Sequence, residues 1–465
     1  MPEPTSAIWW IRRDLRLSDN HALNAALGSA QRVIPLFILD PFFERYPTPA
    51  RQSFLFNGLR ALDDDLRALG SRLIVRRGNP AEVLKQVCVE IGTRNVFAEQ
   101  DFSPYAKRRD SLVSEHASLS LIPGVTIHPP GSVCKNDGSP YSIFTPFRNA
   151  WNAFPQPGKS SDAPQSLGEI STLVSEVIPE STNSLHWEAG ERPAQRKLEH
   201  FIEKELTDYA NMRNFPAHDG TSQLSPYIHF GMLSARQVWH AVKQAQLGSK
   251  NTDFVKSCQI FIDELVWREF YTTILHFFPY VLNQAFRPKH DRLEWRDDPS
   301  ALKAWQCGET GYPMVDAGMR QLAQTGWMHN RVRMIVASFL VKDLFIDWKA
   351  GQAWFMRMLV DGDAASNNGG WQWTAGTGTD AAPFFRVFNP VLQGKRFDPV
   401  GEYVRRYIPE LNAVPNGFIH EPWLMPNSLQ NQLGIKIGRD YPHPIVEHSA
   451  ARERAIKAWQ ALRLT

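Results

Sequence analysis

The sequence predicts an α/β domain with a parallel sheet, joined by a long linker to a mostly α-helical domain. Short apolar runs alternate with amphipathic stretches over residues 1–130, a pattern typical of strands covered by helices on both faces. Residues 131–200 are rich in Pro, Ser, Gly and Asn and lack sustained periodicity, which predicts a connector on the surface. Helical spacing prevails over residues 201–465, which predicts the second domain.

Five apolar runs in the first domain are expected to be strands: Ala7–Ile11, Val33–Leu39, Leu73–Val75, Asn95–Ala98 and Val125–Ile127. Between them, residues Arg51–Leu69 and Ala81–Ile91 have helical patterns, and Pro80 suits a helix start. Apolar strands that alternate with helices predict a Rossmann-like parallel sheet. No GxGxxG motif follows the first strand, so a dinucleotide bound in the usual way is not expected.

Helices are predicted in the second half because Phe254, Cys258, Phe261 and Leu265 recur at intervals of three or four residues. Residues Val315–Phe345 continue this pattern apart from Gly326. We expect this half to be α-helical.

Composition narrows the class of protein. The net charge of +3 neither requires nor excludes nucleic acid, and the four cysteines form no CxxC pair. No apolar run approaches the roughly 18 residues of a membrane span. We expect a soluble, cytoplasmic protein with reduced thiols that does not bind membranes. The 15 tryptophans are equally compatible with large cores and with a special role, so their positions must decide.

Residues Thr221–Tyr227 place three hydroxyls beside Pro226 at a predicted helix start. Free backbone N–H groups and the helix dipole would suit an anion there. Simple N-capping by the hydroxyls is the alternative, and it would be favoured if the segment stood alone.

Residues Asp263–Tyr271 are predicted to present Glu264, Trp267 or Arg268, and Tyr271 on one helix face. A carboxylate beside an indole and a guanidinium suits a nucleobase, which hydrogen-bonds at its edge and stacks on its face. An amphipathic surface helix with ion pairs is the alternative.

Residues Trp327–Met334 place Asn330 and Met334 on one helix face, and a buried arginine in this segment would need a carboxylate partner. Residues Asp361–Trp373 offer two acids, two amides, two glycines and two tryptophans, a mixture expected of a loop that holds a polar heterocycle. An Asp-rich metal loop is the rival. The acids lack the spacing and terminal Glu of an EF-hand, so we expect no metal.

Together these segments resemble the photolyase/cryptochrome family, and specifically the class I photolyases that act on cyclobutane pyrimidine dimers. The resemblance rests on WWIRRDLRLSDNHAL, TSQLSPYIHFG, WREFY, GYPMVDAGMRQL, TGWMHNRVRM, LVKDLFIDW, DGDAASNNGGWQW and TGTDAAPFFRVFNP. These motifs span nearly the whole chain in fixed order. The resemblance implies an N-terminal antenna domain, a linker and a helical domain that binds folded FAD.

The resemblance also implies which residues hold FAD. An ion pair between Arg333 and Asp361 is expected beside the flavin, and Asn367 would face its reducible ring nitrogen. In this respect the chain resembles photolyases, which have Asn at that position, whereas cryptochromes often have Asp or Cys. The full set of implied cofactor contacts is Tyr209, Thr221, Ser222, Gln223, Leu224, Ser225, Arg268, Asn330, Arg333, Asp361, Gly362, Asp363 and Asn367.

For the substrate, the resemblance implies a dimer flipped out of the DNA and stacked on Trp267 and Trp373. Glu264 would hydrogen-bond its base edge and Met334 would pack against it, so Glu264, Asn367 and Met334 are the implied catalytic residues. Six-four photolyases resemble this site but have histidine where this chain has Asn330. The implied DNA contacts are Arg213, Glu264, Trp267, Arg268, Tyr271, Asn330, Arg331, Trp373, Lys395 and Arg396.

Three tryptophans match the electron relay of the family: Trp371 near the flavin, then Trp348, then Trp295 at the surface. Without the surrounding motifs, three unrelated core tryptophans would be the simpler interpretation. Tyr105-Ala106 stands where folate-binding members have Asn-Glu, so a deazaflavin antenna is favoured over methenyltetrahydrofolate.

The function that the resemblance implies is light-driven repair of cyclobutane pyrimidine dimers by a monomeric, deoxyribodipyrimidine photo-lyase type of enzyme with reduced, anionic FAD. A cryptochrome that signals without repair is the alternative, although such proteins usually carry a long C-terminal extension and this chain ends at Thr465. A flavin enzyme of dark metabolism is a third class. The sequence shows no acid–base pair for it.

Overall fold

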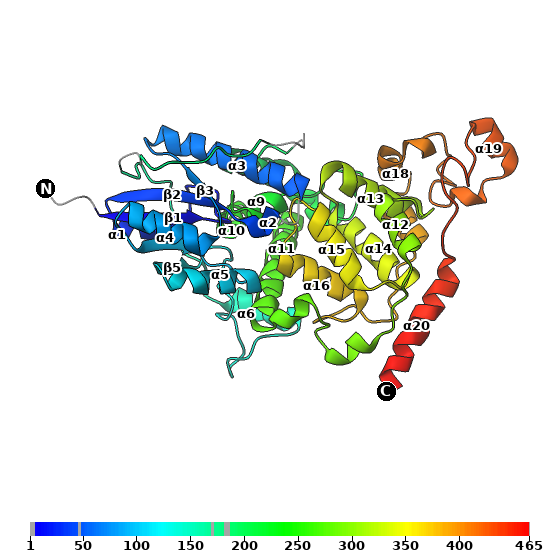
Figure 1. The fold of residues 1–465 in the computed structure, drawn as a ribbon. Coiled ribbons are helices and arrows are strands. Elements are labelled where there is room, and N and C mark those ends of the chain that lie inside the picture. Colours follow the sequence, from blue (N-terminus) through cyan, green and yellow to red (C-terminus); the bar gives the residue numbers. More distant parts are fainter. Residues whose placement is uncertain (1–4, 45–47, 169–171, 181–186, 465) are drawn as a thin grey trace. The chain divides into compact units, whose positions relative to one another are not determined.

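The computed structural model describes residues 5–44, 48–168, 172–180 and 187–464 (Figure 1). The chain forms two compact units. The first comprises Met1–Ala210 with Ser222–Pro279, and the second comprises Asn211–Thr221 with Tyr280–Thr465. This division runs through the predicted domain 201–465, because three of its helices, α9 (Ser225–His229), α10 (Ala235–Gln246) and α11 (Thr252–Phe277), belong to the first unit.

The first unit contains a five-stranded, wholly parallel sheet in the order β3-β2-β1-β4-β5. The strands are β1 (Ser6–Ile11), β2 (Arg32–Leu39), β3 (Ile74–Arg77), β4 (Asn95–Glu99) and β5 (Ser118–Ile122). Strands β1 and β2 are apolar and almost wholly buried, as expected for a sheet covered on both faces. The predicted α/β class is therefore confirmed. The strand order reverses between β1 and β4, where open α/β sheets commonly bind ligands.

Helices connect the strands, in the alternation that the sequence predicts (Figure 1). They are α1 (His21–Ser29), α2 (Pro41–Glu44), α3 (Pro49–Ala68), α4 (Pro80–Glu90) and α5 (Pro104–Ser114). Proline occupies the first position of α3, α4 and α5, where its missing N–H costs no helical hydrogen bond. Asn79 and Ser103 cap α4 and α5 with their side chains.

The fifth strand was predicted at the wrong place. It lies at Ser118–Ile122 and pairs with β4, whereas the apolar run Val125–Ile127 binds a helix. That helix is α11 (Thr252–Phe277). Its Arg268 donates to the Val125 carbonyl at 2.8 Å, and its Glu269 accepts from the backbone N–H groups of Ile127 and His128.

The predicted connector, residues 131–200, contains two helices, α6 (Phe144–Ala153) and α7 (Glu191–His200). Their presence corrects the interpretation of this stretch as one without helical periodicity. Helix α6 folds because its aromatic stripe packs on α11, a partner more than a hundred residues away. The remaining helices of the first unit are α9 (Ser225–His229) and α10 (Ala235–Gln246), while α8 (Tyr209–Met212) lies at the boundary of the units.

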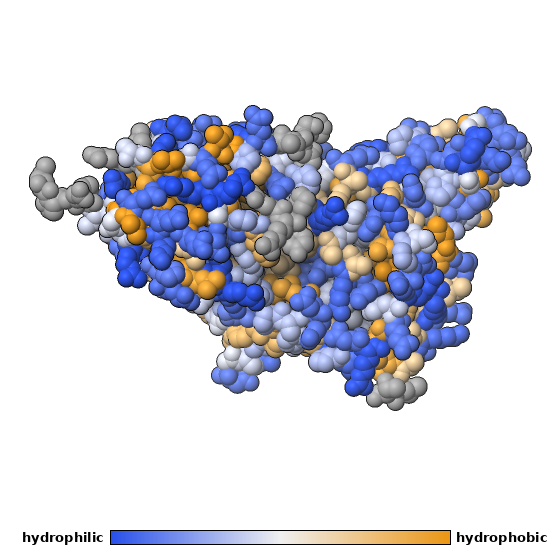
Figure 2. All heavy atoms as spheres, viewed as in Figure 1, coloured by the Kyte–Doolittle hydropathy of each residue, from blue (hydrophilic) through white to orange (hydrophobic). Residues whose placement is uncertain are grey.

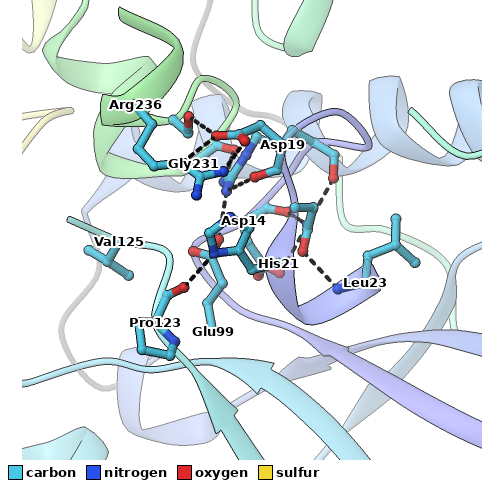
Figure 3. Close-up of polar contacts among 12 residues, drawn as sticks. Asp14, Asp19, His21, Leu23, Glu99, Pro123, Val125, Gly231 and Arg236 are labelled. Atoms are coloured by element: carbon cyan, nitrogen blue, oxygen red, sulfur yellow. Dashed lines mark hydrogen bonds and ion pairs between the residues drawn. The ribbon is translucent and has the colours of Figure 1, made fainter. Parts of the chain in front are cut away.

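A buried ionic network ties the sheet to α10 within the first unit (Figure 3). Arg16 donates to Glu99 at the end of β4 at 2.6 Å, and also to the Gly231 carbonyl at 3.0 Å. Asp19 accepts from Arg236 and from Ser234, the residue that caps α10. Buried charges are tolerated when each has partners of this kind, so this network holds α10 at a defined position on the sheet.

The second unit is helical, as predicted. Its helices are α12 (Pro299–Cys307), α13 (Pro313–Thr325), α14 (Asn330–Ser338), α15 (Trp348–Met358), α16 (Ala364–Ala375), α17 (Pro390–Phe397), α18 (Glu402–Tyr407), α19 (Asn427–Leu433) and α20 (His448–Leu464). Gly326 ends α13 with a left-handed φ of 66°, which explains the break seen in the sequence pattern. One apolar core includes Trp305, Leu340, Phe355 and Trp371.

The surface is mostly hydrophilic on the face shown in Figure 2, including the region over α19. Among the described residues, no helix combines the length and apolar character needed to span a bilayer. The four cysteines, Cys88, Cys134, Cys258 and Cys307, are all free thiols.

Candidate functional site

Helix α11 presents the first group of predicted site residues. Asn251 caps it by accepting from the N–H groups of Asp253 and Phe254, and the helix runs for 26 residues. Glu264, Trp267, Arg268 and Tyr271 follow one another at helical spacing, and all four are half-buried, whereas Leu265, Val266 and Phe270 are buried. The predicted common face is therefore present. It is polar and aromatic, and it is partly accessible to solvent.

Two of these side chains have defined partners within the first unit. The indole of Trp267 stacks on Phe144 of α6 with ring centroids 3.6 Å apart and an interplanar angle of 6°. Arg268 uses one nitrogen to hold the Val125 carbonyl, so part of its donor capacity fixes the backbone. Sequence reasoning missed Phe144, because nothing local to residue 144 indicates its partner.

Residues Ser222–Leu224 lead into the five-residue helix α9, with Leu224 at the N-cap and no side-chain cap hydrogen bond. Simple N-capping by the hydroxyls is therefore not what the structure shows. Gln223 has a left-handed φ of 47°, an uncommon conformation for a residue other than glycine that often occurs at ligand-binding loops. Tyr209 is buried against Phe201 and Phe261, and Thr221 belongs to the second unit.

In the second unit, α14 carries Asn330, Arg331, Arg333 and Met334. Asn330 and Met334 lie one turn apart and are exposed and half-buried, respectively. Arg333 donates to Asp361 at 2.8 Å and to the Met328 carbonyl at 2.8 Å. The ion pair expected between Arg333 and Asp361 is present.

His329 caps α14 by accepting from the N–H of Arg331 at 3.1 Å through Nδ1. Burial lowers its pKa to about 3, and the nearby Arg333, Arg331 and Arg213 add to the effect. The ring is therefore neutral at physiological pH. Its buried Nε2 has no hydrogen-bond partner among the described residues, which leaves one polar atom available to a ligand.

The segment Asp361–Trp373 was predicted as a loop, and this prediction is wrong beyond Asp363. Asp363 accepts from the N–H groups of Ala365 and Ser366 and caps helix α16. The amides of Asn368 and Gln372 each donate to the Val281 carbonyl at 2.8 Å. This one distant carbonyl accepts from both of the amides that make the segment look unsuited to a helix.

Two further members of this segment, Gly362 and Asn367, are placed by backbone contacts. The N–H of Gly362 bonds the Leu359 carbonyl at 3.3 Å. Asn367 is half-buried, and its amide nitrogen donates to the Gln352 carbonyl of α15 at 3.0 Å. That bond fixes the orientation of its side chain on α16.

The three predicted relay tryptophans all lie in the second unit. Trp371 and Trp348 are 2% and 1% exposed, whereas Trp295 is half-buried and packs on Phe345 with centroids 5.1 Å apart. Gly351 allows Trp371 to approach α15, since a Cβ there would lie 2.1 Å from the indole. The sequence did not single out Trp305, which lies 6.1 Å from Trp371.

Basic side chains gather near Arg331. Burial lowers the pKa of Arg331, and the positive charges of Arg213, Arg396 and Arg386 lower it further. Arg331 also donates to Asn214 at 2.6 Å. Arg386, which sequence reasoning missed, lies 5.9 Å from the centre of the Trp373 ring. A concentration of positive charge of this kind suits a phosphate backbone.

Comparison with known families bears directly on these motifs. A family model for DNA photolyase matches residues 7–165, and a model for the FAD-binding domain of DNA photolyase matches residues 261–461. The deoxyribodipyrimidine photo-lyase of Escherichia coli is 40% identical over 99% of both chains, and that of Agrobacterium fabrum is 39% identical over 98% of both. This chain belongs to the DNA photolyase family.

Solved structures of a photolyase and of a cryptochrome agree with this assignment. A bacterial class III photolyase from Agrobacterium tumefaciens superposes on this chain with a TM-score of 0.90 at 38% identity. The match covers 100% of this chain and 99% of that photolyase. A Synechocystis cryptochrome superposes with a TM-score of 0.91 at 30% identity and covers 98% of this chain and 100% of its own. The two-part architecture of this photolyase is thus the one found in the family.

The residues of this photolyase suit FAD. The FAD-binding model spans residues 261–461, which include the partly buried ion pair of Arg333 with Asp361 and the unpartnered Nε2 of His329. The buried Nε1 of Trp371 also has no acceptor among the described residues. Polar atoms buried without partners are rare in native proteins unless a ligand or water meets them. The photolyase therefore binds FAD with residues of this domain.

Proposed function

We propose that this photolyase repairs cyclobutane pyrimidine dimers in DNA with the energy of light. The observation that carries the proposal is the half-buried indole of Trp267 beside Glu264 on one face of α11. A dimer has apolar faces and polar edges, so an indole and a carboxylate together match it. Relatives named deoxyribodipyrimidine photo-lyase are 38–40% identical to this chain.

Each residue has a proposed part in the reaction. Trp267 and Trp373 stack on the flipped dimer, Glu264 hydrogen-bonds its base edge, and Met334 excludes water beside it. FAD in its reduced, anionic form, when bound, would supply one electron for the light-driven opening of the cyclobutane ring and would regain it once both bonds are broken. We assign its binding to the residues already named from the resemblance, of which Arg333 and Asp361 form the ion pair and Asn367 is fixed by Gln352.

Photoreduction of the cofactor is assigned to Trp371, Trp348 and Trp295. Indoles can be oxidised, and their burial decreases from the first two to the last. Such a gradient supports a route that begins in the core and ends at solvent.

DNA docking is assigned to Arg213, Arg331, Lys395 and Arg396, together with Asn330 and Tyr271. Lys395 contributes less than expected from the sequence, because Glu421 pairs with it at 2.5 Å. Arg386 is added to the group on account of its place beside Trp373.

We further propose a deazaflavin antenna in the first unit. Ala106 in α5 is 1% exposed and supplies no carboxylate of the kind that folate-binding relatives have there. Tyr105 bonds Asp40 and stacks on Phe42 with centroids 4.1 Å apart, which makes an aromatic wall for a planar ring. The absorption spectrum of the extracted chromophores, compared with deazaflavin and folate standards, tests this assignment.

A single copy of the chain suffices for this scheme, and we propose a cytoplasmic monomer, in line with its free thiols. The rival function is blue-light signalling without repair, which the likeness to the Synechocystis cryptochrome favours. The decisive assay incubates the chemically reduced protein with ultraviolet-damaged oligothymidylate under blue light. Recovery of the absorbance of the restored double bonds supports repair. No recovery in light would refute repair, and recovery in darkness would refute the photochemical step.

A further inference from the structure

Helix α6 packs on α11 through a single stripe of side chains. Phe144, Phe147, Arg148 and Trp151 are spaced as i, i+3, i+4 and i+7, the spacing of one helix face. The stripe contacts residues 263–270 of α11 by three kinds of interaction. Phe147 packs on Phe270 at 5.4 Å, Arg148 donates to Asp263 at 3.2 Å, and Trp151 donates to Glu269 at 2.7 Å.

These contacts make α6 a rigid support for α11. Trp151 and Glu269 are both buried, and Glu269 also holds the backbone of Ile127 and His128. A helix fixed by an apolar contact, an ion pair and a buried hydrogen bond cannot slide along its neighbour without losing all three. The first residue of the stripe, Phe144, is therefore held in place.

Phe144 meets Trp267 face to face, with ring centroids 3.6 Å apart and planes 6° from parallel. Isolated aromatic pairs prefer offset or edge-to-face arrangements, so the surrounding packing imposes this one. Phe144 is 6% exposed and also lies edge-on to Phe270 at 5.9 Å. Because Phe144 covers one face of the indole, a base can stack only on the other.

We infer that Phe144 is a positioning residue for damage recognition, which holds the Trp267 indole in the plane on which the dimer stacks. The inference rests on the proposed function. An indole already fixed in its binding orientation loses less conformational freedom when the dimer arrives. The bases of undamaged DNA are costlier to extrude from the duplex, so we expect none on Trp267 and an effect of Phe144 on the affinity for damaged DNA alone.

The test compares Phe144→Leu with Phe147→Leu in the full-length photolyase. Both substitutions remove a phenyl ring from the same helix face, but only the first removes the stack on Trp267. For Phe144→Leu, the dissociation constant for an oligonucleotide with one dimer should rise about twofold to tenfold, the range of an aromatic pair. The dissociation constant for undamaged DNA, and the repair yield per photon at saturating DNA, should stay unchanged.

The Phe147→Leu variant should retain the ratio of the two dissociation constants, even if its melting temperature falls as far as that of Phe144→Leu. An equal loss of that ratio in both variants would overturn the inference, because it would show a general weakening of α6. An unchanged ratio in Phe144→Leu would overturn it as well.

A double-mutant comparison separates this inference from the proposed function. In a Trp267→Ala background, Phe144→Leu should cause no further loss of dimer affinity, because the residue acts through the indole. A further loss there would refute that route. If Trp267→Ala alone leaves dimer affinity intact, the assignment of Trp267 fails and this inference fails with it. If Trp267→Ala weakens binding and Phe144→Leu does not, only the inference fails.

Discussion

Arg333 of α14 and Asp361, which precedes α16, form an ion pair of 2.8 Å in which the carboxylate side chain is 3% exposed and the arginine 23%. The pair joins two segments that both carry proposed flavin contacts. Arg333 is also tied to the Met328 carbonyl, so its guanidinium cannot follow a displaced partner. Removal of the charge on Asp361 would therefore leave a positive group without its neighbour.

We expect Asp361→Asn to lose FAD. Removal of one partner from a fully buried ion pair costs about 3–5 kcal/mol, and the cost is lower where solvent reaches the remaining charge. A cost of about 1.4 kcal/mol already weakens binding tenfold. The flavin-to-protein absorbance ratio after gel filtration measures the loss. Glu410→Gln, which breaks the more exposed Arg320–Glu410 pair, is the matched control and should retain FAD. Full retention by Asp361→Asn would contradict the assignment.

Trp371→Phe should block photoreduction of the oxidised flavin and leave repair by the chemically reduced enzyme nearly intact. Phenylalanine fills much of the space but is far harder to oxidise than indole, so photoreduction should slow by about tenfold or more, a barrier increase of about 1.4 kcal/mol or more. Flash or steady illumination with an external reductant, followed at the flavin absorption bands, measures the rate.

Trp305→Phe is the control for that experiment. Trp305 is buried, its ring centroid lies 6.1 Å from that of Trp371, and it is outside the proposed relay. It should leave photoreduction unchanged. If Trp371→Phe abolishes repair as well, Trp371 has another role. If both variants block photoreduction, the route is not the one assigned.

The sheet was predictable in outline because the sequence pattern of most strands is local. Strand β2 is apolar from Val33 to Leu39, and α4 begins at Pro80 directly after its N-cap, Asn79. Each of these elements could be recognised without its neighbours. The fifth strand was misplaced because Val125–Ile127 is as apolar as a strand. Its partner, α11, lies about 140 residues away, and periodicity over a short run carries no information about such a partner.

The candidate site shows the same division between local and distant causes. The common face of Glu264 and Trp267 follows from helical spacing alone. The helical state of Ala364–Ala375 does not, because Asn368 and Gln372 are satisfied by the Val281 carbonyl. Likewise the stack of Phe144 on Trp267 depends on two helices meeting, which no pattern within either helix specifies.

Glu269 should make the stability of the photolyase depend on pH. Burial raises its pKa from 4.5 to about 7, although three N–H donors oppose the shift. The folded state therefore binds this proton more tightly than the unfolded state. Its stabilising contribution is present below about pH 4.5 and is lost as the pH rises towards about 7. Glu269→Gln cannot titrate, so its free energy of unfolding should lack this decline.

Urea unfolding of the wild type and of Glu269→Gln at pH 5 and pH 8 measures the effect. The wild type should lose up to about 3 kcal/mol relative to the variant over this interval, the equivalent of a shift of about two pKa units. If the difference in unfolding free energy between the two proteins stays constant with pH, the carboxylate is ionised throughout and is held by Trp151 and the two backbone N–H groups.

Arg396 and Lys395 are neighbours on α17 that should differ in their effect on DNA binding. Lys395 is paired with Glu421 at 2.5 Å, whereas the described partner of Arg396 is the ring of Phe397 at 5.1 Å, which leaves its charge available to a phosphate. Each phosphate contact contributes about 0.9 to the slope of log affinity against log salt. Arg396→Gln should therefore reduce that slope by about one unit, and Lys395→Gln by clearly less. Titration of a fluorescent damaged duplex at several salt concentrations gives both slopes. Equal slopes for the two variants would mean that Lys395 leaves Glu421 on binding, since only a released ammonium group could displace a counterion as arginine does.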